Sequence, residues 1–309
     1  MRVFVTGATG FVGQEVVRQL HLDGHVVRIL ARNPKSPGVQ EMLSLYGAEA
    51  HRGDVMSAAS LAGALTGVDA AIHLVGIISE YGESTFENVH VRGTRNLVEA
   101  AQQSKIGRFV HMSALGTRPD AVARYHQTKW AAEEIVRRSG RHYTIFRPSL
   151  IFGVRDHFVN LFARMIRLSP ILPIMGSGKA RFCPVAVETV GEAFVRSLTE
   201  SESVDQTYDL CGPEILTLPE MLDQILEAMG RKRVKLRVPL GLAWLLAAIL
   251  EFAFPHVLGE APPLNRDQLI MLQEDNVGDP RSANDLFKLR PRAFKEGIRS
   301  YLKLQSRKP

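Results

Sequence analysis

The first half of the chain alternates short apolar runs with segments whose apolar residues recur at helical spacing. The runs predict strands at residues 2–6, 25–31, 48–51, 69–75 and 108–113. The segments between them predict helices at residues 11–22, 57–65, 86–104 and 125–138. Regular alternation of strand and helix is typical of a doubly wound parallel sheet, so we predict an α/β Rossmann fold.

After residue 153 the pattern becomes mainly helical and less regular. Helices are predicted at residues 158–168 and 219–229, and the stretch 170–178, punctuated by proline and glycine, is expected to be a loop. We therefore expect a Rossmann domain over residues 1–153, to which residues 180–212 return, and a smaller, mainly helical substrate lobe over residues 154–309.

A glycine-rich turn joins the first predicted strand to the first predicted helix. Gly7, Gly10 and Gly13 are spaced Gly-x-x-Gly-x-x-Gly. A turn this tight needs a residue without Cβ at Gly7, and Gly13 allows the helix to pack closely on the strand. Gly10 leaves room for a pyrophosphate, which the free N–H groups of the helix would bind. The strand before this turn and the amphipathic helix after it favour a dinucleotide site over a simple turn. Further cofactor contacts are expected in the same turn at Thr9, Phe11 and Val12.

The end of the second predicted strand indicates which dinucleotide is preferred. NAD-preferring sites usually place an acidic residue here, whereas this chain has Arg32 and its nearest downstream acid is Glu41. Arg32, helped by Lys35, suits a 2′-phosphate, although an arginine at a strand end is also a common solvated residue. We predict NADP as the preferred cofactor and NAD as the alternative.

The ends of the third and fourth predicted strands supply more candidate contacts. Asp54 and Val55 could hold the adenine, although Asp54 is equally compatible with a turn or helix-capping residue. Val75 and Gly76 end the fourth strand, where the cofactor would cross the sheet edge. His73 lies within that strand, and we expect it to be a hydrogen-bonded core residue rather than a catalyst.

Three polar residues form a candidate catalytic set. Ser113 ends the fifth predicted strand, at the carboxyl edge where parallel sheets bind ligands. Tyr125 and Lys129 are four residues apart, so they share one face of the next helix. An adjacent ammonium would lower the pKa of Tyr125, which could then exchange a proton with a substrate oxygen that Ser113 polarises. Lys129 would also hold the nicotinamide ribose. Such pairs are common on helix surfaces, but their order after the glycine turn and the strand-end serine favours catalysis.

These motifs resemble the extended and atypical short-chain dehydrogenase/reductase superfamily. The resemblance rests on residues 6–13, on the set Ser113, Tyr125 and Lys129, and on residues 147–153. Within the superfamily, the chain is similar to the branch of the NADPH-binding accessory subunit of respiratory complex I and its bacterial relatives, often labelled epimerase/dehydratase. Segments 88–96, 184–190 and 208–213 extend this likeness over most of the chain.

The resemblance implies further roles and carries two departures. It implies that Pro148 and Ser149 border the nicotinamide and that Val55 borders the adenine. The fourth strand ends in Val75 and Gly76, where many extended members have paired alanines. The spacer between the catalytic serine and tyrosine is shorter than in sugar-nucleotide epimerases, which argues against a sugar-nucleotide substrate.

Composition excludes several other classes of protein. The chain has 309 residues, 45% of them apolar and 23% charged, as in soluble globular proteins. The net charge of +6 is modest and most basic residues are scattered, so nucleic-acid binding is not expected. Cys183 and Cys211 show no metal-ligand spacing and make no disulfide framework, which suits a reducing, cytoplasmic compartment. We expect no metal site and no cleaved signal peptide.

One basic and apolar stretch, residues 231–258, lies outside these motifs. Five basic residues at positions 231–237 precede the apolar run 238–258. Pro239, Glu251 and Pro255 interrupt that run, which leaves too short a helix to span a bilayer. We favour a helix packed in the substrate lobe. The alternative is an interfacial helix in peripheral contact with anionic lipid headgroups, which would suit a lipid-soluble substrate.

The predicted function is that of an NAD(P)-dependent oxidoreductase or epimerase/dehydratase-like enzyme. It would act on a carbonyl or alcohol of an unidentified small molecule, with Tyr125 as acid or base. The alternative, implied by the resemblance to the complex I subunit, is an NADPH-binding structural or regulatory protein without turnover. The superfamily also implies a homodimer that pairs helices near residues 86–104 and 125–138.

Overall fold

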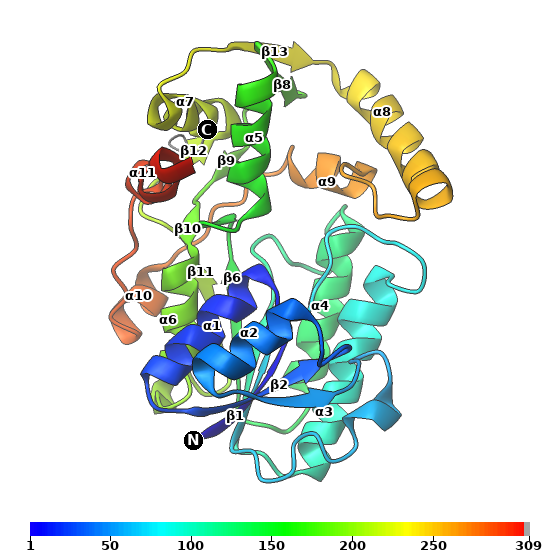
Figure 1. The fold of residues 1–309 in the computed structure, drawn as a ribbon, viewed down its shortest axis with the longest axis vertical. Helices are drawn as coiled ribbons and strands as arrows, with labels where there is room; N and C mark the ends of the chain where they lie inside the picture. Colours follow the sequence, from blue (N-terminus) through cyan, green and yellow to red (C-terminus); the bar gives the residue numbers. More distant parts are fainter. Residues whose placement is uncertain (306–309) are drawn as a thin grey trace.

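Seven parallel strands form one central sheet in the computed structural model, which describes residues 1–305 (Figure 1). The strands are β1 (Arg2–Thr6), β2 (Val26–Ala31), β3 (Glu49–Arg52), β4 (Ala70–His73), β5 (Arg108–Met112), β6 (Tyr143–Pro148) and β11 (Gln206–Leu210). Their order is β11-β6-β5-β4-β1-β2-β3, and every neighbouring pair is parallel. The strand order reverses between β1 and β4, so the predicted Rossmann sheet is confirmed.

Helices cover both faces of this sheet because successive strand residues point to opposite sides. Val3 and Val5 of β1 share a core with the layer of α1 (Phe11–Leu22), α2 (Pro37–Tyr46) and α6 (Val187–Arg196). Phe4 shares a core with the opposite layer, which contains α3 (Gly93–Gln103), α4 (Arg124–Arg137) and the 3₁₀ turn η1 (Ala58–Leu61). All three β1 side chains are fully buried, which explains why the strand is a continuous apolar run.

Two predicted helices of the first half take a different form. The helix expected at residues 57–65 is only the short turn η1, because the chain leaves the helical conformation at Ala62 and turns at Gly63, whose φ is 73°. The helix expected at residues 86–104 begins with a π-helical segment, η2 (Glu87–Arg92), and continues as α3. Such π segments often lie at functional sites.

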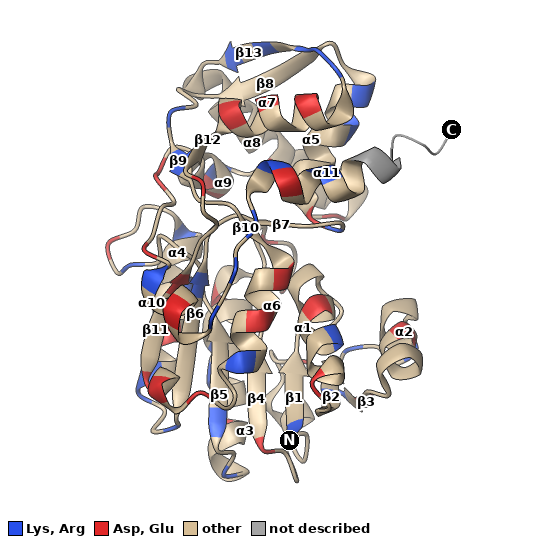
Figure 2. Cartoon of the chain, turned by 90° about the vertical axis from the view of Figure 1, so that its left-hand side faces the viewer, with Lys and Arg blue, Asp and Glu red and all other residues tan. Residues whose placement is uncertain are grey.

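The rest of the chain builds a smaller lobe beyond the carboxyl ends of the central strands (Figure 2). Its helices α5 (His157–Leu168), α7 (Leu218–Met229) and α11 (Phe294–Gln305) enclose a separate apolar core that includes Leu222 and Ile298. Short strand pairs complete it: β7 (Ile151–Phe152) with β10 (Val185–Ala186), β9 (Arg181–Phe182) with β12 (Leu216–Thr217), and β8 (Ile171–Met175) with β13 (Val234–Val238). The expected loop at residues 170–178 therefore contains a strand, because β13 offers it a parallel partner. The turn η3 (Ser201–Ser203) and the helix α10 (Arg281–Leu286) flank the central sheet.

A long apolar helix forms the outer edge of the smaller lobe (Figure 1). α8 (Leu240–Ala253) continues directly into the π-helical turn η4 (Phe254–Leu258), so the prediction of a helix cut short at Pro255 is wrong. Pro255 lies where the α-helix changes to the wider π-helical turn of η4. Within residues 1–305, this 19-residue stretch is the one helix long and apolar enough to cross a membrane.

The favoured prediction that this helix packs inside the lobe is also wrong. In α8 only Ala243 and Ala247 are buried, where they meet Leu269 of α9 (Arg266–Met271). The larger apolar side chains point outward, because only the narrow alanine stripe faces the rest of the protein.

Candidate cofactor and active site

The glycine turn closes tightly against the end of β4. Gly7 has a φ of 75°, and a Cβ on it would lie 3.0 Å from the carbonyl carbon of Leu74. A Cβ on Gly13 would overlap the carbonyl oxygen of Gly7, so α1 packs directly on the turn. The N–H of Gly10 donates to the same carbonyl oxygen at 3.0 Å. Glycine at these positions therefore brings the start of α1 against the ends of β1 and β4.

The start of α1 has the features of an anion site. Gly10 provides no side-chain cap, so the first N–H groups of this 12-residue helix are left for a ligand. Thr9 is exposed at the tip of the turn, while Val12 and Gly13 are buried beneath it. Phe11 packs against Gly153, just after β7. This arrangement fits the pyrophosphate of a dinucleotide.

Unpaired basic side chains stand at the ends of β2 and β3. Arg32 directly follows β2, and Arg52 ends β3 opposite Ala31. Both are exposed, and neither guanidinium has an ion pair or hydrogen bond with any residue that the structure describes. Lys35 is also exposed, and its backbone N–H donates to Asn33. Arg52 was missed in the sequence, although it directly follows the strand predicted at residues 48–51. Positive charge at this edge suits the 2′-phosphate of NADP.

Asp54 and Val55 follow β3 in a local turn. One carboxylate oxygen of Asp54 accepts the N–H of Met56 at 2.9 Å, and the N–H of Asp54 donates to Ser60 Oγ at 2.9 Å. Val55 is buried against Gly93 of α3. Asp54 therefore has the turn role raised as an alternative above, and the contact of both residues with adenine stays a prediction.

Lys129 connects the ends of β4 and β5 from its position on α4. The side chain is buried, and Nζ donates to the carbonyl oxygen of Met112 at 2.5 Å. Nζ also lies 3.9 Å from the position that a Cβ on Gly76 would take. Burial lowers the pKa of Lys129 to about 8, against the opposing effect of Glu133. Lys129 thus reaches the carboxyl edge of the sheet, beside Gly76 and next to Ser113.

Ser113 and Tyr125 both precede this lysine along the chain. Ser113 directly follows β5, is buried, and donates from Oγ to Thr117 Oγ1 at 3.5 Å. Tyr125 is one helical turn before Lys129, with its ring centroid 5.4 Å from that of His90 and 6.0 Å from that of Phe86. Its hydroxyl has no hydrogen-bonding partner among the described residues.

The pKa of Tyr125 differs from the sequence prediction. Burial raises the pKa of Tyr125 to about 12, because the apolar surroundings penalise the phenolate. The expected lowering by Lys129 is not found, and burial alone accounts for the shift. At neutral pH the phenol is protonated, which equips it to donate a proton rather than to accept one.

Histidines support the site without taking part in the predicted chemistry. His90 accepts the N–H of Ile77 at 3.1 Å, so η2 holds the loop after Gly76. Burial lowers the pKa of His90 to about 2, so it is neutral. His73 is bonded to Thr6 at 2.7 Å and to Thr94 at 3.1 Å, which confirms it as a satisfied core histidine.

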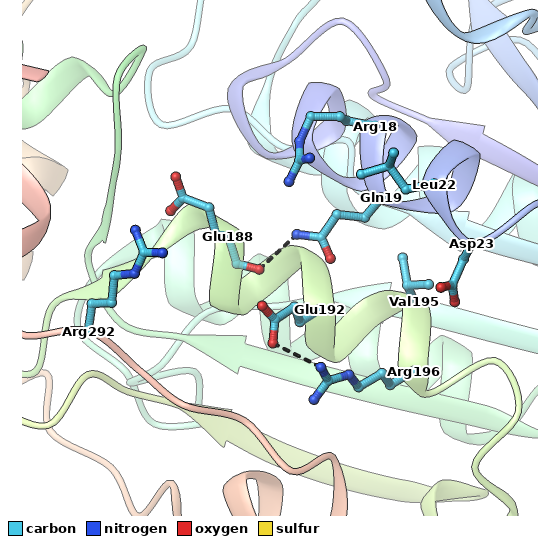
Figure 3. Close-up of a pocket in the computed structure, with 9 residues that line it drawn as sticks. All are labelled: Arg18, Gln19, Leu22, Asp23, Glu188, Glu192, Val195, Arg196 and Arg292. Atoms are coloured by element: carbon cyan, nitrogen blue, oxygen red, sulfur yellow. Dashed lines mark hydrogen bonds and ion pairs between the residues drawn. The ribbon is translucent and has the colours of Figure 1, made fainter. Parts of the chain in front are cut away.

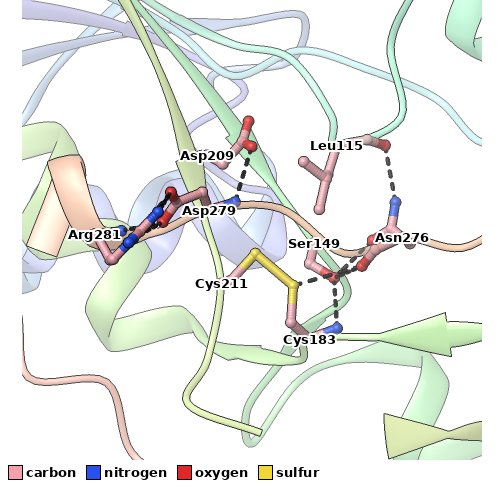
Figure 4. Close-up of a disulfide and its surroundings, with 8 residues drawn as sticks. All are labelled: Leu115, Ser149, Cys183, Asp209, Cys211, Asn276, Asp279 and Arg281. Atoms are coloured by element: carbon pink, nitrogen blue, oxygen red, sulfur yellow. Dashed lines mark hydrogen bonds and ion pairs between the residues drawn. A yellow bond between two sulfur atoms is a disulfide. The ribbon is translucent and has the colours of Figure 1, made fainter. Parts of the chain in front are cut away.

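Two segments of the smaller lobe complete the site and were missed in the sequence. Asp267 of α9 accepts the N–H groups of Arg124 and Tyr125 at 2.9 and 2.7 Å, so it caps the helix that carries the tyrosine. Asn276 accepts the Ser149 hydroxyl at 2.6 Å and donates to the carbonyl oxygen of Leu115 at 2.9 Å (Figure 4). An isolated Asp and Asn far along the chain carry no motif, so only the fold could bring them here.

Pro148 and Ser149 leave β6 at this same point. The N–H of Leu115 donates to the Pro148 carbonyl oxygen at 2.9 Å, and the N–H of Ser149 donates to Leu210 at 3.0 Å. Ser149 thus lies between β11 and the loop after Ser113. Its contact with nicotinamide, implied by the resemblance, stays a prediction.

A disulfide joins Cys183 and Cys211, so the expectation of unlinked cysteines is wrong (Figure 4). Their Cα atoms are 5.1 Å apart, although 28 positions separate them in the sequence. The N–H of Gly212 donates to the carbonyl oxygen of Cys183 at 3.1 Å, and a Cβ on Gly212 would overlap Pro184. This close crossing of the chain beside β11 brings the cysteines together. The inference of a reducing compartment from cysteine usage therefore loses its basis.

A surface hollow of about 330 Å³ lies away from this site, between α1 and α6 (Figure 3). Its polar side chains bind one another: Gln19 donates to the Glu188 carbonyl oxygen at 2.9 Å, and Arg196 pairs with Glu192 at 3.3 Å. The hollow is at the end of α1 that points away from the glycine turn, so we assign it no part in cofactor binding.

Comparison with known proteins agrees with this geometry. Residues 7–153 match the model of an NAD(P)H-binding family. The chain is 28% identical to an Arabidopsis thaliana protein named NADH dehydrogenase [ubiquinone] 1 alpha subcomplex subunit 9, over 88% of this chain and 70% of that protein. It is 32% identical to the ceramide reductase of Caulobacter vibrioides, over 62% of this chain and 59% of that protein. The structure of UDP-glucuronic acid 4-epimerase from Bacillus cereus, which contains NAD, superposes with a TM-score of 0.74 at 19% identity, covering 99% and 100% of the two chains.

The fold, the glycine turn and these matches define a class. Residues 7–153 form an NAD(P)H-binding Rossmann domain, and the chain as a whole is similar to extended short-chain dehydrogenase/reductase-like proteins. Over most of its length the chain is also similar to subunits of mitochondrial complex I.

Proposed function

We propose that this protein is an NADP(H)-dependent reductase that acts on a carbonyl group of a small molecule. The observation that carries this proposal is the position of Lys129, whose buried ammonium lies between the Met112 carbonyl oxygen and Gly76. Lys129 thus lies at the strand ends, bonded to the residue before Ser113 and one helical turn after Tyr125. The unpaired Arg32 and Arg52 support NADP over NAD.

Each residue of the set has a distinct chemical role in this proposal. When bound, the nicotinamide supplies the hydride. Tyr125 donates its proton to the substrate oxygen, and Ser113 donates a hydrogen bond to the same oxygen. Lys129 holds the ribose and keeps positive charge close to the phenol. The phenol begins the reaction protonated at neutral pH, as the reducing direction requires.

Replacement of Tyr125 by phenylalanine tests this function. Tyr125→Phe keeps the ring packing against His90 and removes only the proton donor, so we expect NADPH binding to be unchanged. Turnover should fall by at least about 100-fold, the usual contribution of a positioned acid. NADPH oxidation is measured with a panel of ketones and aldehydes, and Tyr46→Phe, at the end of α2, is the matched control. Wild-type turnover by Tyr125→Phe would refute the role of Tyr125.

A second candidate function is cofactor binding without turnover. It is supported by the likeness to a complex I subunit over 88% of the chain. In that case the wild-type protein would bind NADPH, reduce none of the carbonyl compounds, and co-purify with proteins of a membrane complex. The two candidates therefore differ in wild-type turnover, whatever the variants do.

The proposal also includes the assembly and the location of the protein. We infer a homodimer that pairs α3 and α4 of two copies, and a protein peripheral to a membrane. Analytical ultracentrifugation should give twice the monomer mass of 34.3 kDa. A monomer at micromolar concentration would contradict the dimer.

A further inference from the structure

The helix formed by α8 and η4 exposes large apolar side chains to solvent. The side chain exposure is 58% for Leu245, 54% for Ile249, 70% for Phe252 and 77% for Val257. We call the exposed apolar side chains of residues 240–258 the α8 surface. A helix on the surface of a soluble protein normally turns a polar face outward, whereas a helix that is apolar all round is normally buried. The α8 surface is therefore exposed, although its composition is that of a helix that is normally buried.

The one charged residue of this helix does not lie on the α8 surface. Glu251 is largely turned inward, where its carboxylate accepts the N–H of Arg266 and pairs with its guanidinium, both at 2.7 Å. Glu251 is thus neutralised at the contact with α9. Apart from His256, the side chains that remain outside are apolar, as expected of a helix that contacts lipid rather than water.

Unpaired cations precede the α8 surface, along β13 and in the turn before it. Arg231, Lys232 and Arg237 are exposed, and none forms an ion pair or hydrogen bond through its side chain with the described part of the chain. Blue segments of the ribbon around β13, at the top of Figure 2, mark basic residues of this part of the chain. Ile171 and Val234, paired across β8 and β13, are exposed beside these cations. An apolar helix next to a basic segment complements the headgroups and acyl chains of an anionic bilayer.

We propose that the α8 surface lies in the interface of an anionic lipid bilayer and holds the protein there peripherally. A spanning helix does not fit, because both of its ends are attached to one folded body. β13 pairs with β8 just before α8, and Asp267 caps α4 just after it. Contact with a second copy through this surface would bring the same unpaired cations of two chains together, which is unfavourable. This proposal does not depend on the proposed reductase activity.

Flotation with vesicles of defined composition tests the proposal. The full-length protein is mixed with vesicles of phosphatidylcholine alone or with phosphatidylglycerol added. We expect wild type to float with the anionic vesicles, less with neutral ones, and less at high salt. The double variant Leu245→Glu/Ile249→Glu should stay in the soluble fraction, because it puts charge into the apolar interface. Leu45→Glu on α2, whose exposure is 58% like that of Leu245, is the matched control and should float like wild type.

The basic residues give an independent measurement. Arg231→Gln/Lys232→Gln should weaken binding to anionic vesicles by roughly fivefold per residue and leave binding to neutral vesicles unchanged. NADPH binding by every variant shows that the fold is intact. The proposal is overturned if wild type floats with neither vesicle. The proposal is equally overturned if Leu245→Glu/Ile249→Glu floats like wild type. A double variant that dissociates a dimer, in a protein that binds no lipid, would also overturn it.

Discussion

Replacing Lys129 by methionine should make the protein more stable at neutral pH while it removes the proposed activity. The pKa of Lys129 falls from its ordinary value of 10.5 to about 8 because the ammonium is buried. Since one pKa unit corresponds to about 1.4 kcal/mol, the charged ammonium costs the folded protein about 3 kcal/mol below pH 8. Methionine leaves the Met112 carbonyl oxygen without its donor, a loss of about 1 kcal/mol. The net gain in the free energy of unfolding is therefore about 2 kcal/mol at pH 7.

The pH dependence of this gain identifies its origin. The folded-state pKa is lowered, so the unfolded chain binds more protons between about pH 8 and pH 10.5. As the pH rises through that window, Lys129 loses its proton in the folded protein and the free energy of unfolding of wild type increases. The stability advantage of Lys129→Met should therefore shrink. Urea unfolding at pH 7 and pH 10 measures this difference, with the exposed Lys179→Met as control. A variant that is less stable than wild type at pH 7, or an advantage independent of pH, would refute the reasoning.

Three further predictions follow from other parts of the structure. Arg32→Ala should weaken NADPH binding by roughly tenfold to 100-fold and leave NADH binding unchanged, because only NADPH carries the 2′-phosphate. Calorimetry measures both affinities, and equal losses of NADPH and NADH affinity would contradict this role of Arg32. Cys211→Ser should lower the free energy of unfolding by about 3 kcal/mol, and reductant should lower wild type to the same value but leave the variant unaffected, as urea unfolding would show. Gly13→Ala should abolish NADPH binding or folding, because its Cβ meets the Gly7 carbonyl oxygen. Gly24→Ala, whose Cβ would have no neighbour within 4 Å, should cost much less stability. Circular dichroism and calorimetry compare the two variants.

The central sheet could be predicted because its signals are local. Val3, Phe4 and Val5 are buried on alternate faces, so a short apolar run is sufficient to indicate a strand covered by helices. Ser113 could be placed at the sheet edge because it ends a predicted strand. Lys129 could be placed there because it lies in the first turns of the predicted helix that follows. The strand β8 was missed because Pro173 and the glycines after it resemble a loop, and only pairing with β13 makes it a strand.

Features that depend on tertiary contact could not be predicted from local pattern. The cysteines meet only because the chain crosses itself at Gly212 and Pro184. Asn276 reaches Ser149 from a segment 127 positions away. An apolar helix has the same sequence pattern whether it is buried or faces lipid, so the exposure of α8 could be known only from the structure. The pKa of Tyr125 depends on how far Phe86, His90 and their neighbours exclude water, which the spacing to Lys129 does not encode.

The most direct test of the central claim is a crystal structure of the protein with NADPH bound. The proposed function requires the cofactor to lie across the carboxyl edge of the sheet, with its pyrophosphate on the glycine turn. We predict that a hydroxyl of the nicotinamide ribose lies about 3 Å from Lys129 Nζ, with the Tyr125 hydroxyl facing the nicotinamide. A nucleotide bound elsewhere, or a nicotinamide on the far side of the sheet from Tyr125, would contradict it.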